Sequence, residues 1–388
     1  MAAHWKYALL TLHHPFPNRS MTASFKVEDY ALPHLAGMEP YVPGIQPNDT
    51  DWIKLNTNEN PFPPSPRVSA AIIEALSNGG ERLRLYPNPT SAKLREALAA
   101  YHKVEVSNVI VGNGSDEILT LLMRCFSGAR NTAGFAVPSY SLYPVLANAQ
   151  GATCVECPFE RDFKLDGAGI EDCGSSVFFL TSPNAPSGIG FTNQAISAVL
   201  ERFPGLFVVD EAYAAFAEQD ALPLLGAYPN LCIVRTFSKS HGLAGLRVGY
   251  ALASPEVIRL LDAVRDSYNL DHLAQIGALA ALSDPAYYQG TISKIVRIRD
   301  TYLKALRQRG WFAYDSQSNF IFTEPVDAAG GKGPDVAHAL YTWLKERKIL
   351  VRYFGGHPLT RSFVRITVGN EDAMQRLLEA LDVWAPSK

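Results

Sequence analysis

The sequence predicts an α/β fold, in which a large domain with a mostly parallel, doubly wound sheet is joined to a smaller α+β domain. Between about residue 66 and residue 283, stretches with apolar residues at helical spacing alternate with short apolar runs that end in small or polar residues. That alternation is typical of parallel strands whose connecting helices cover both faces of the sheet. The chain has 388 residues, which is long for one core, and its pattern changes after about residue 285.

The expected elements of the large domain follow one another along the chain. Helical spacing occurs in PRVSAAIIEAL (66–76), SAKLREALAAY (91–101) and SDEILTLLMRCF (115–126). The runs that predict strands are NVIVG (108–112), TAGFAV (132–137), ATCVEC (152–157), SVFFL (176–180), GLFVVD (205–210), LCIV (231–234) and VGYALA (248–253).

The smaller domain begins with a long predicted helix, AYYQGTISKIVRIRDTYLKALRQRG (286–310). It continues with a strand NFIFT (319–323), a helix near 334–348, strands ILVRY (349–353) and FVRITV (363–368), and a helix over 370–381. We therefore expect an N-terminal arm over 21–60 that joins the small domain, a large domain over 61–283 and the small domain over 284–388. Residues 1–20 are expected to be a disordered leader or an upstream start, and less readily a transit peptide.

Composition excludes several classes of function. The formal net charge is -3 and charged residues make up 19% of the chain, so we expect no nucleic-acid partner. No stretch approaches transmembrane length, so we expect no membrane partner and a cytoplasmic protein. The five cysteines predict no disulfide framework. Because Cys154-x-x-Cys157 has no second ligand pair nearby, we expect core packing there and no metal site.

Polar residues follow five of the predicted strands. In a parallel α/β sheet, ligands bind at the carboxyl edge of the strands, so these residues are expected to face one crevice. Taken singly, each has an ordinary structural explanation, such as a helix cap, a turn or a half-buried aromatic ring. Their order and spacing argue for a shared site, formed by Gly114-Ser115-Asp116, Tyr140, the turn SPNAPSG (182–188), Asp210 with Tyr213, and Ser238-Lys239.

The chemistry that these residues support together is that of pyridoxal 5'-phosphate. A buried lysine with a lowered pKa forms a Schiff base with an aldehyde and then serves as a proton shuttle, which is the role expected for Lys239. Asp210, at the end of an apolar strand, would keep the pyridine nitrogen protonated. The phosphate would bind where a helix begins, at Gly114, Ser115 and Asp116. Ser238 and Arg247 are expected to complete that phosphate site.

In these residues the chain resembles the fold-type-I pyridoxal-phosphate aminotransferases, and it looks most like their histidinol-phosphate branch. The resemblance covers nearly all of the chain after Met21. It rests on the ordered motifs PYVPG, KLNTNENP, RLYPNP, VGNGSDE, VPSYSLYP, SPNAPSG, VVDEAYAAF, RTFSKSHGLAGLRVGY and VRITVG. It implies transfer of an amino group between L-histidinol phosphate and 2-oxoglutarate, a reaction of histidine biosynthesis. It also implies that Tyr140 stacks on the cofactor ring, that Tyr213 donates to the ring hydroxyl and that Tyr86 reaches the phosphate of a neighbouring subunit in a homodimer.

The same resemblance assigns substrate binding to the small domain and the N-terminal arm. Arg365, which read alone is an exposed strand residue, is implied to clamp the substrate α-carboxylate, with Asn319 beside it. Tyr41 and Arg352 match positions that contact the phosphate of histidinol phosphate. Three alternatives stay open: an aromatic amino-acid aminotransferase, a phosphothreonine decarboxylase of the same fold, and a regulator that uses the fold without turnover.

One position departs from the family pattern. The family usually has an asparagine directly before the Pro-Ser/Thr-Gly turn, where its amide donates to the ring oxygen of the cofactor, and this chain has Ala185. Loss of a donor there is expected to raise the pKa of the Schiff base. We expect Asn184 to compensate in part, although the turn would have to rotate for its side chain to reach the site. If Asn184 does not compensate, Tyr213 is the only side-chain donor to the ring oxygen.

Overall fold

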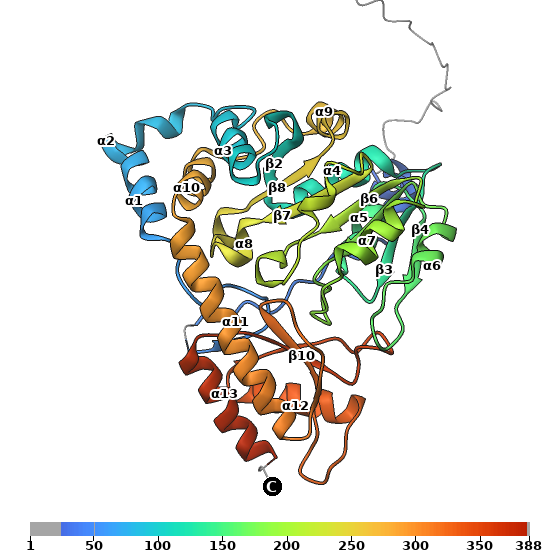
Figure 1. Ribbon diagram of the computed structural model, residues 1–388, viewed down its shortest axis with the longest axis vertical. Coiled ribbons are helices and arrows are strands. Elements are labelled where there is room, and N and C mark those ends of the chain that lie inside the picture. Colours follow the sequence, from blue (N-terminus) through green and yellow to red (C-terminus); the bar gives the residue numbers. More distant parts are fainter. Residues whose placement is uncertain (1–24, 50, 386–388) are drawn as a thin grey trace, which may run out of the picture.

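The computed structural model describes residues 25–49 and 51–385, so the predicted leader over 1–20 lies outside the described residues. A large sheet with its helices occupies one end of the molecule, and the C-terminal elements occupy the other (Figure 1). The long helix α11 (Pro285–Gln308) starts below α10 and runs down into the C-terminal part (Figure 1). The predicted boundary at 283/284 falls directly before this helix, and it stays a prediction.

The large sheet has seven strands in the order β2-β8-β7-β6-β5-β3-β4. All pairs are parallel except the two that β8 makes with β2 and β7. The sequence therefore predicted this mostly parallel α/β sheet correctly. The strands are β2 (Val109–Asn113), β3 (Ala133–Val137), β4 (Cys154–Pro158), β5 (Val177–Thr181), β6 (Leu206–Asp210), β7 (Leu231–Thr236) and β8 (Val248–Ala253).

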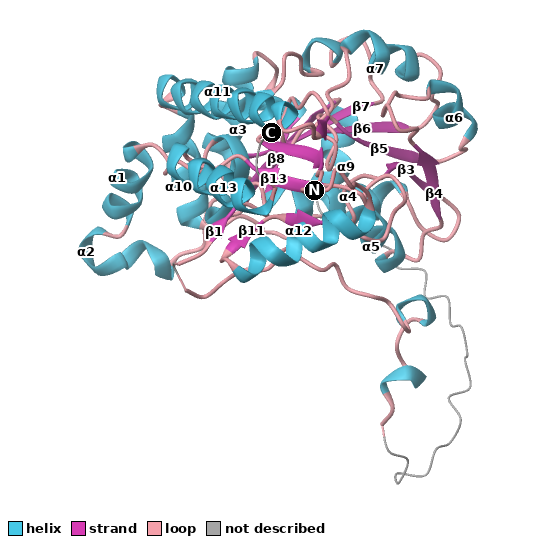
Figure 2. Cartoon of the chain, turned by 90° about the horizontal axis from the view of Figure 1, so that it is seen from below, coloured by secondary structure: helices cyan, strands magenta, loops and turns pink. Residues whose placement is uncertain are grey.

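Helices cover both faces of this sheet, because successive side chains of a strand point to opposite faces. Phe207 and Val209 of β6 pack into one apolar cluster with α3, α7 and α10, whereas Val208 packs into another with α4, α5 and α9. Figure 2 shows β5 to β7 between α7 on one side and α4 and α5 on the other. The helices of this part are α1 (Pro66–Ala75), α2 (Ser77–Gly80), α3 (Ala92–His102), α4 (Gly114–Phe126), α5 (Leu142–Ala149), α6 (Gly167–Asp172), α7 (Asn193–Leu200), α8 (Phe237–Ser240), α9 (Pro255–Val264) and α10 (His272–Leu282).

The C-terminal part is built on an antiparallel sheet in the order β12-β13-β10-β9, covered by α11, α12 and α13. A separate parallel pair joins β1 of the N-terminal arm to β11. The elements are β1 (Ile53–Lys54), β9 (Phe312–Ala313), β10 (Phe320–Glu324), α12 (Pro334–Glu346), β11 (Ile349–Leu350), β12 (Arg352–Tyr353), β13 (Val364–Thr367) and α13 (Glu371–Trp384). Short 3₁₀ helices lie at Val27–Asp29, Pro33–Leu35, Glu81–Arg84, Val106–Asn108, Ala214–Phe216, Leu222–Leu224 and Ala244–Leu246.

One expected strand is divided. The run ILVRY was predicted as a single strand, but its first two residues pair with the N-terminal arm and its last two pair with β13. The division at Val351 lets one apolar run contribute to two sheets, and it brings Arg352 opposite Arg365. Within the described residues, no helix is both long enough and apolar enough to cross a membrane. All five cysteines are free.

Candidate active site

A cavity of about 770 Å³ lies at the carboxyl edge of the large sheet, where that sheet faces the C-terminal part. Residues that follow β2, β3, β5, β6 and β7 line it, as the strand-end rule predicts. Because β8 runs against its neighbours, the residue before it lies at the same edge as the residues after them. This reversal explains why Arg247 and Lys239, eight positions apart, both reach the cavity.

Lys239 is placed by the short helix α8, whose first turn is capped by the Thr236 hydroxyl. Its amine donates to the backbone carbonyl of Thr57, at 3.0 Å. Burial, and secondarily the positive charge of Arg365, lower the pKa of Lys239 to about 8. A fraction of the amine is therefore neutral and nucleophilic near pH 7.

Asp210 ends β6 and is 3% exposed. Its carboxylate accepts hydrogen bonds from the Tyr143 hydroxyl at 2.8 Å and from the Ala212 amide at 3.2 Å. Burial raises the pKa of Asp210 to about 6, against the lowering effect of those two donors. Near pH 7 the cavity therefore holds a mostly ionised carboxylate, suited to a cationic ring nitrogen.

The start of α4 offers a binding place for an anion. Gly114, Ser115 and Asp116 form its first turn, where backbone N–H groups have no helical acceptor. Arg247 lies across this turn, and its guanidinium donates to the Asp116 carboxylate at 3.1 Å. Gly114 has φ +78°, and a Cβ on it would collide with the Arg247 side chain, so the close approach requires glycine. Ser238 lines the same end of the cavity.

The Asp116 carboxylate cannot donate to a phosphate, so its side chain positions other groups. Its second oxygen accepts from the Tyr140 hydroxyl at 3.1 Å. Tyr140 in turn meets Tyr41 of the N-terminal arm edge to face, with ring centroids 5.8 Å apart. The Asp116 backbone N–H remains available to an anion at the helix start.

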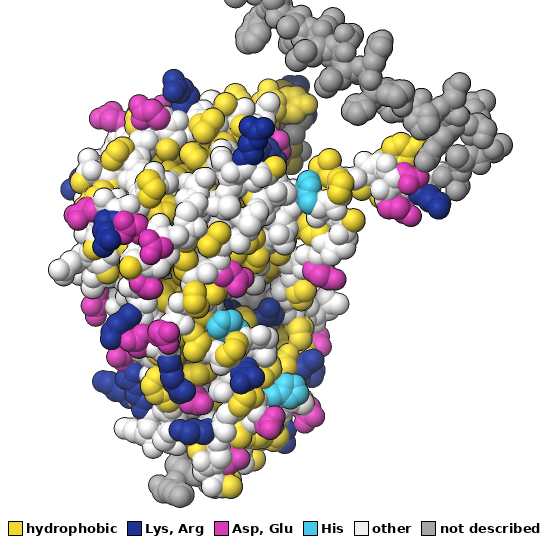
Figure 3. Space-filling view, turned by 90° about the vertical axis from the view of Figure 1, so that its right-hand side faces the viewer, with side chains coloured by type: hydrophobic (Ala, Val, Ile, Leu, Met, Phe, Trp, Pro, Cys, Tyr) yellow, Lys and Arg dark blue, Asp and Glu magenta, His cyan; other side chains and the backbone are white. Residues whose placement is uncertain are grey.

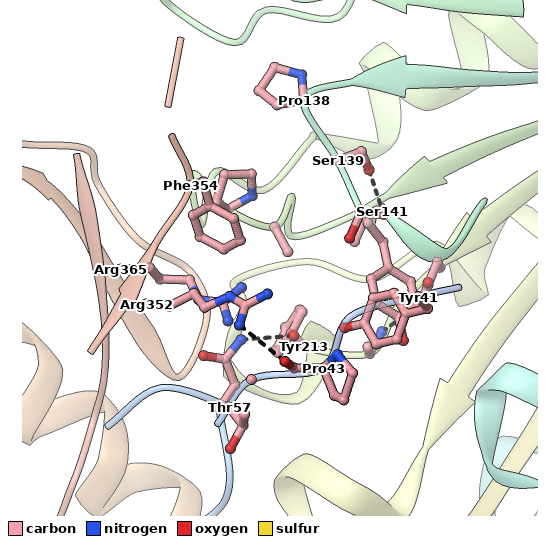
Figure 4. A pocket seen from close by; sticks show the side chains of 18 of the residues that line it. Tyr41, Pro43, Thr57, Pro138, Ser139, Ser141, Tyr213, Arg352, Phe354 and Arg365 are labelled. Carbon is pink, nitrogen blue, oxygen red and sulfur yellow. Dashed lines mark hydrogen bonds between the residues drawn. The ribbon is translucent and has the colours of Figure 1, made fainter. Parts of the chain in front are cut away.

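Tyr213 lines the cavity and is 8% exposed (Figure 4). Its hydroxyl accepts a hydrogen bond from the side-chain amide of Asn58, at 2.9 Å. Asn58, in the motif KLNTNENP, was not predicted as a site residue. Its position in an irregular loop, distant along the chain from the strands of the large sheet, concealed it, although its left-handed φ of 55° is one that asparagine favours.

Asn184 is a correction to the sequence analysis. It is fully buried and does not line the cavity. Its amide nitrogen donates to the Pro138 carbonyl at 3.2 Å, and its oxygen accepts from the amide and the hydroxyl of Ser187. The Asn184 side chain stabilises the turn and lies outside the cavity lining, whereas Ala185 faces the cavity.

Two arginines form the opposite wall of the cavity. Arg352 of β12 and Arg365 of β13 are direct cross-strand partners, and both guanidinium groups point into the cavity beside Phe354 (Figure 4). Like charges directly opposite each other on a sheet are destabilising, so the pair calls for an anion. Arg352 donates to the carbonyls of Val42 and Pro43 at 3.3 and 3.4 Å.

Two buried polar atoms on this wall have no hydrogen-bond partner among the described residues: Nε of Arg365 and Oδ1 of Asn319. The Asn319 amide nitrogen donates to the Asn58 carbonyl at 2.9 Å, and Arg365 donates to the Asn56 carbonyl at 3.1 Å. Orphaned buried polar atoms are costly, and a ligand in the cavity could satisfy Nε of Arg365, because Arg365 lines the cavity. Asn319 does not itself line the cavity.

Tyr86 lies away from this cavity. Its side chain is 80% exposed and stacks on Tyr268, with ring centroids 4.4 Å apart. Exposed apolar side chains lie near Tyr86 in the sequence, including Leu83 and Leu85.

The first described residues project from the body of the molecule and carry further hydrophobic side chains (Figure 3).

The sequence analysis also missed Tyr143. This residue is fully buried, its hydroxyl lies 2.6 Å from that of Thr181, and it donates to Asp210. Its signal was present in VPSYSLYP, where a second tyrosine follows Tyr140 by three residues. At the start of α5 that spacing turns one hydroxyl toward Asp116 and the other toward Asp210.

We call Lys239, Asp210, Tyr213, Ser238 and Arg247 the cofactor side of the cavity. We call Tyr41, Arg352 and Arg365, together with Asn319 outside the cavity lining, the substrate side. The cofactor side presents a partly neutral amine and a buried carboxylate, together with an anion-binding helix start. The substrate side presents two arginines that form no ion pair within residues 25–49 and 51–385.

Comparison with known proteins places this geometry in context. Residues 50–381 match the model of the family described as aminotransferase class I and II. The chain is 42% identical over 356 residues to a histidinol-phosphate aminotransferase of Citrifermentans bemidjiense, covering 92% of this chain and 98% of that protein. It is 43% identical over 354 residues to one of Syntrophotalea carbinolica, covering 90% and 97%.

Solved structures give the same architecture. The histidinol-phosphate aminotransferase of Sinorhizobium meliloti, in complex with pyridoxal-5'-phosphate, superposes with a TM-score of 0.77 at 28% identity, over 84% of this chain and 89% of that one. The L-threonine-O-3-phosphate decarboxylase of Porphyromonas gingivalis superposes with a TM-score of 0.72 at 24% identity, over 85% and 98%. The second likeness shows a shared fold alone.

Proposed function

The chain belongs to the class I and II aminotransferase family, and we propose that it exchanges the amino group of L-histidinol phosphate with 2-oxoglutarate, giving imidazole acetol phosphate and L-glutamate. This is a step of histidine biosynthesis, and the cofactor is pyridoxal 5'-phosphate. The observation that carries the choice of substrate is the pair of arginines opposite each other on β12 and β13.

The residues present fit this cofactor. Lys239 supplies a buried amine for the aldehyde carbon, and Asp210 supplies a buried carboxylate for the ring nitrogen. The start of α4, with Ser115, Ser238 and Arg247, supplies donors for the phosphate. Gly114 leaves the space that the Arg247 guanidinium occupies beside that helix start. When bound, the cofactor supplies an electron sink that stabilises negative charge on the substrate α-carbon.

The chain's own groups then perform three tasks. Lys239 would hold the cofactor through its aldehyde carbon, with loss of water, and once the substrate amine has replaced it there, the free Lys239 amine would carry the proton that leaves the substrate α-carbon. Asp210 keeps the ring nitrogen protonated through a charge-assisted hydrogen bond. The substrate side orients the substrate. Because the reacting groups are then aligned, a general base of modest strength is sufficient to remove the α-proton.

The substrate side suits histidinol phosphate for an electrostatic reason. This amine has no carboxylate, and its only anion is a phosphomonoester, which carries a charge of about -1.5 to -2 near pH 7. Two guanidinium groups match that charge, and Arg365 offers an unpaired Nε as well. Glutamate presents a carboxylate to the same clamp in the other half of the reaction. We include Tyr41, which lines the cavity beside Tyr140, as a further phosphate contact.

Product analysis tests this function. The purified protein, loaded with pyridoxal phosphate, is incubated with 2-oxoglutarate and one donor: histidinol phosphate, phenylalanine or O-phosphothreonine. Histidinol phosphate should give glutamate and imidazole acetol phosphate in equal amounts, at the highest rate of the three. Faster glutamate formation from phenylalanine would make the protein an aromatic aminotransferase, and carbon dioxide release from O-phosphothreonine would make it a decarboxylase. No turnover of any donor would support a regulatory role.

We also propose that the active unit is a homodimer with shared sites. Tyr86 and its exposed apolar neighbours support this, as do the exposed hydrophobic residues Phe25, Val27 and Tyr30 of the projecting arm. In this proposal Tyr86 of one subunit reaches the cofactor phosphate of the other.

Residues 61–283 form the cofactor domain, and residues 284–388 with the arm over 21–60 form the substrate domain. The five free cysteines fit a reducing compartment, and we place the protein in the cytoplasm.

Subunit mixing tests the shared site. Tyr86→Ala and Lys239→Ala proteins are each expected to be nearly inactive. A mixed dimer contains one site with both groups intact, so subunit exchange should restore about a quarter of the wild-type activity in a statistical mixture. Recovery that stays at the sum of the two variants, with exchange verified by mass-tagged subunits, would exclude a shared site.

A further inference from the structure

We propose that Asn58 is a positioning residue that directs the Tyr213 hydroxyl proton toward the ring oxygen of the cofactor, and so offsets the amide donor that Ala185 does not provide. The inference rests on the proposed function, because it requires pyridoxal phosphate in the cavity with its ring oxygen toward Tyr213. It assigns a role in the site to a loop residue between β1 and α1.

The position of Asn58 is strongly defined. The residue is 1% exposed, lines the cavity, and holds a left-handed backbone conformation with φ 55°. Its backbone carbonyl accepts from Asn319 at 2.9 Å, and its backbone amide donates to the Thr367 hydroxyl at 2.9 Å. The Asn58 backbone is therefore held by two hydrogen bonds, which places its side chain beside Tyr213.

The hydrogen bonds around Asn58 have one consistent direction. The Thr367 hydroxyl accepts from the Asn58 backbone amide, and it donates to the Asn58 side-chain oxygen at 3.0 Å. The side-chain nitrogen consequently faces Tyr213 and donates to its hydroxyl oxygen at 2.9 Å. With the amide turned over, the Thr367 proton would lose this acceptor, and Tyr213 would donate to Asn58 instead of to a ligand.

This direction leaves the Tyr213 proton for the cavity. In the described part of the chain the Tyr213 hydroxyl has no hydrogen bond other than the one from Asn58. A hydroxyl that accepts one hydrogen bond is polarised and becomes a stronger donor in the next. Burial raises the pKa of Tyr213, and the charge of Arg365 and the bond from Asn58 oppose that rise. The phenol stays protonated near neutral pH and is activated as a donor.

No other side chain of the turn over 182–188 takes this role. Ala185 faces the cavity with a methyl group and packs in the same apolar cluster as Tyr213. Asn184 donates to the Pro138 carbonyl, accepts from Ser187 and does not line the cavity. The ring oxygen is therefore served by Tyr213, whose direction Asn58 determines.

The test is a pH titration of the visible absorbance of the cofactor-loaded protein, which follows protonation of the lysine–cofactor linkage. A weaker donor leaves more negative charge on the ring oxygen, which favours the protonated linkage and raises the midpoint. Asn58→Gly removes the amide and tolerates the positive φ, so it should raise the midpoint by about half a unit to one unit. Asn78→Gly is the matched control, because exposed Asn78 also has φ 55°, and it should leave the midpoint unchanged.

A double variant separates direct action from loosened structure. Tyr213→Phe alone should raise the midpoint by about one to two units, the equivalent of one charge-assisted hydrogen bond. Asn58→Gly should add nothing in the Tyr213→Phe background, since Asn58 acts through the phenol. Ala185→Asn, which supplies a donor directly, should lower the raised midpoint of Asn58→Gly.

Two results would overturn the inference. An unchanged titration midpoint in Asn58→Gly would show that Asn58 does not orient the Tyr213 hydroxyl. If Asn58→Gly shifted the midpoint equally in the wild-type and the Tyr213→Phe background, the role of Asn58 would be purely structural. Both leave the proposed function standing, because the wild-type band is still present. A wild-type protein that binds pyridoxal phosphate without any pH-dependent band would overturn the function and the inference together.

Discussion

The cofactor side and the substrate side of the cavity differ in how far the chain satisfies its own polar groups. On the cofactor side, the Asp210 carboxylate accepts two hydrogen bonds. The Lys239 amine donates to the Thr57 carbonyl, and the Arg247 guanidinium donates to the Asp116 carboxylate. On the substrate side, two cations face each other across neighbouring strands, and two buried polar atoms have no partner within residues 25–49 and 51–385.

The difference corresponds to what each side binds. A resident cofactor is held continuously, and preorganised groups bind it without rearrangement. A substrate arrives and leaves in each cycle, so its binding energy has to come from groups that are poorly satisfied without it. We therefore expect changes on the cofactor side to affect every substrate alike, and changes on the substrate side to discriminate between substrates.

The largest effect is expected at Lys239. Lys239→Ala removes the amine that bonds the aldehyde and moves the proton, so the lysine-dependent visible band should vanish and kcat should fall on the order of 10⁴-fold or more with every donor. Absorbance spectra and initial rates measure this. An unchanged spectrum with bound cofactor would mean that a different lysine holds it.

Arg365 should have the next largest effect. Arg365→Gln removes a bidentate clamp used in both half-reactions, so kcat/KM should fall by about 150-fold or more for glutamate and for histidinol phosphate, equivalent to about 3 kcal/mol. Its charge also lowers the pKa of Lys239, and this variant should raise that pKa. A loss confined to one half-reaction would contradict the common clamp.

Arg352 should discriminate between donors. Arg352→Ala is expected to lower kcat/KM for histidinol phosphate by roughly 10- to 150-fold, the range for hydrogen bonds to a charged group, with a much smaller loss for phenylalanine. Steady-state rates with both donors measure the ratio. Equal losses would show that Arg352 supports the loop over 42–44 and does not read the phosphate.

The smallest effect concerns the pH dependence of cofactor capture. A Lys239 pKa of about 8 means that the neutral fraction of the amine rises with pH and is nearly complete by pH 9. The rate at which apoprotein gains the visible band with pyridoxal phosphate should rise about tenfold between pH 7 and pH 9 and then level off. A rate that climbs steadily beyond pH 10 would indicate an ordinary, solvated lysine.

The sequence predicted the cofactor side better than the substrate side, for a physical reason. Strand-end residues such as Asp210 and Lys239 follow from local apolar runs and the geometry of parallel sheets. Arg352 and Arg365 meet through antiparallel pairing, and the divided run at Val351 depends on strands far away in sequence. Local pattern carries little information on such pairing.

Individual side-chain directions were predicted least well. The family pattern indicated that position 185 faces the cavity, but it did not indicate that Asn184 hydrogen-bonds the Pro138 carbonyl and Ser187. Tyr143 contacts Asp210 and Asn58 contacts Tyr213, and neither contact follows from the local sequence pattern. Partners of this kind are defined by tertiary packing, which brings Asn58 to a residue 155 positions away.

The most direct test of the two-sided account is a single-turnover experiment without keto acid. Cofactor-loaded wild-type protein is mixed rapidly with histidinol phosphate, with histidinol, or with phenylalanine, and the loss of the visible band is followed. The account predicts the highest second-order rate constant for histidinol phosphate, at least about 100-fold above that for histidinol, which lacks only the phosphate. Similar rate constants for histidinol and histidinol phosphate would contradict a substrate side built for a phosphate.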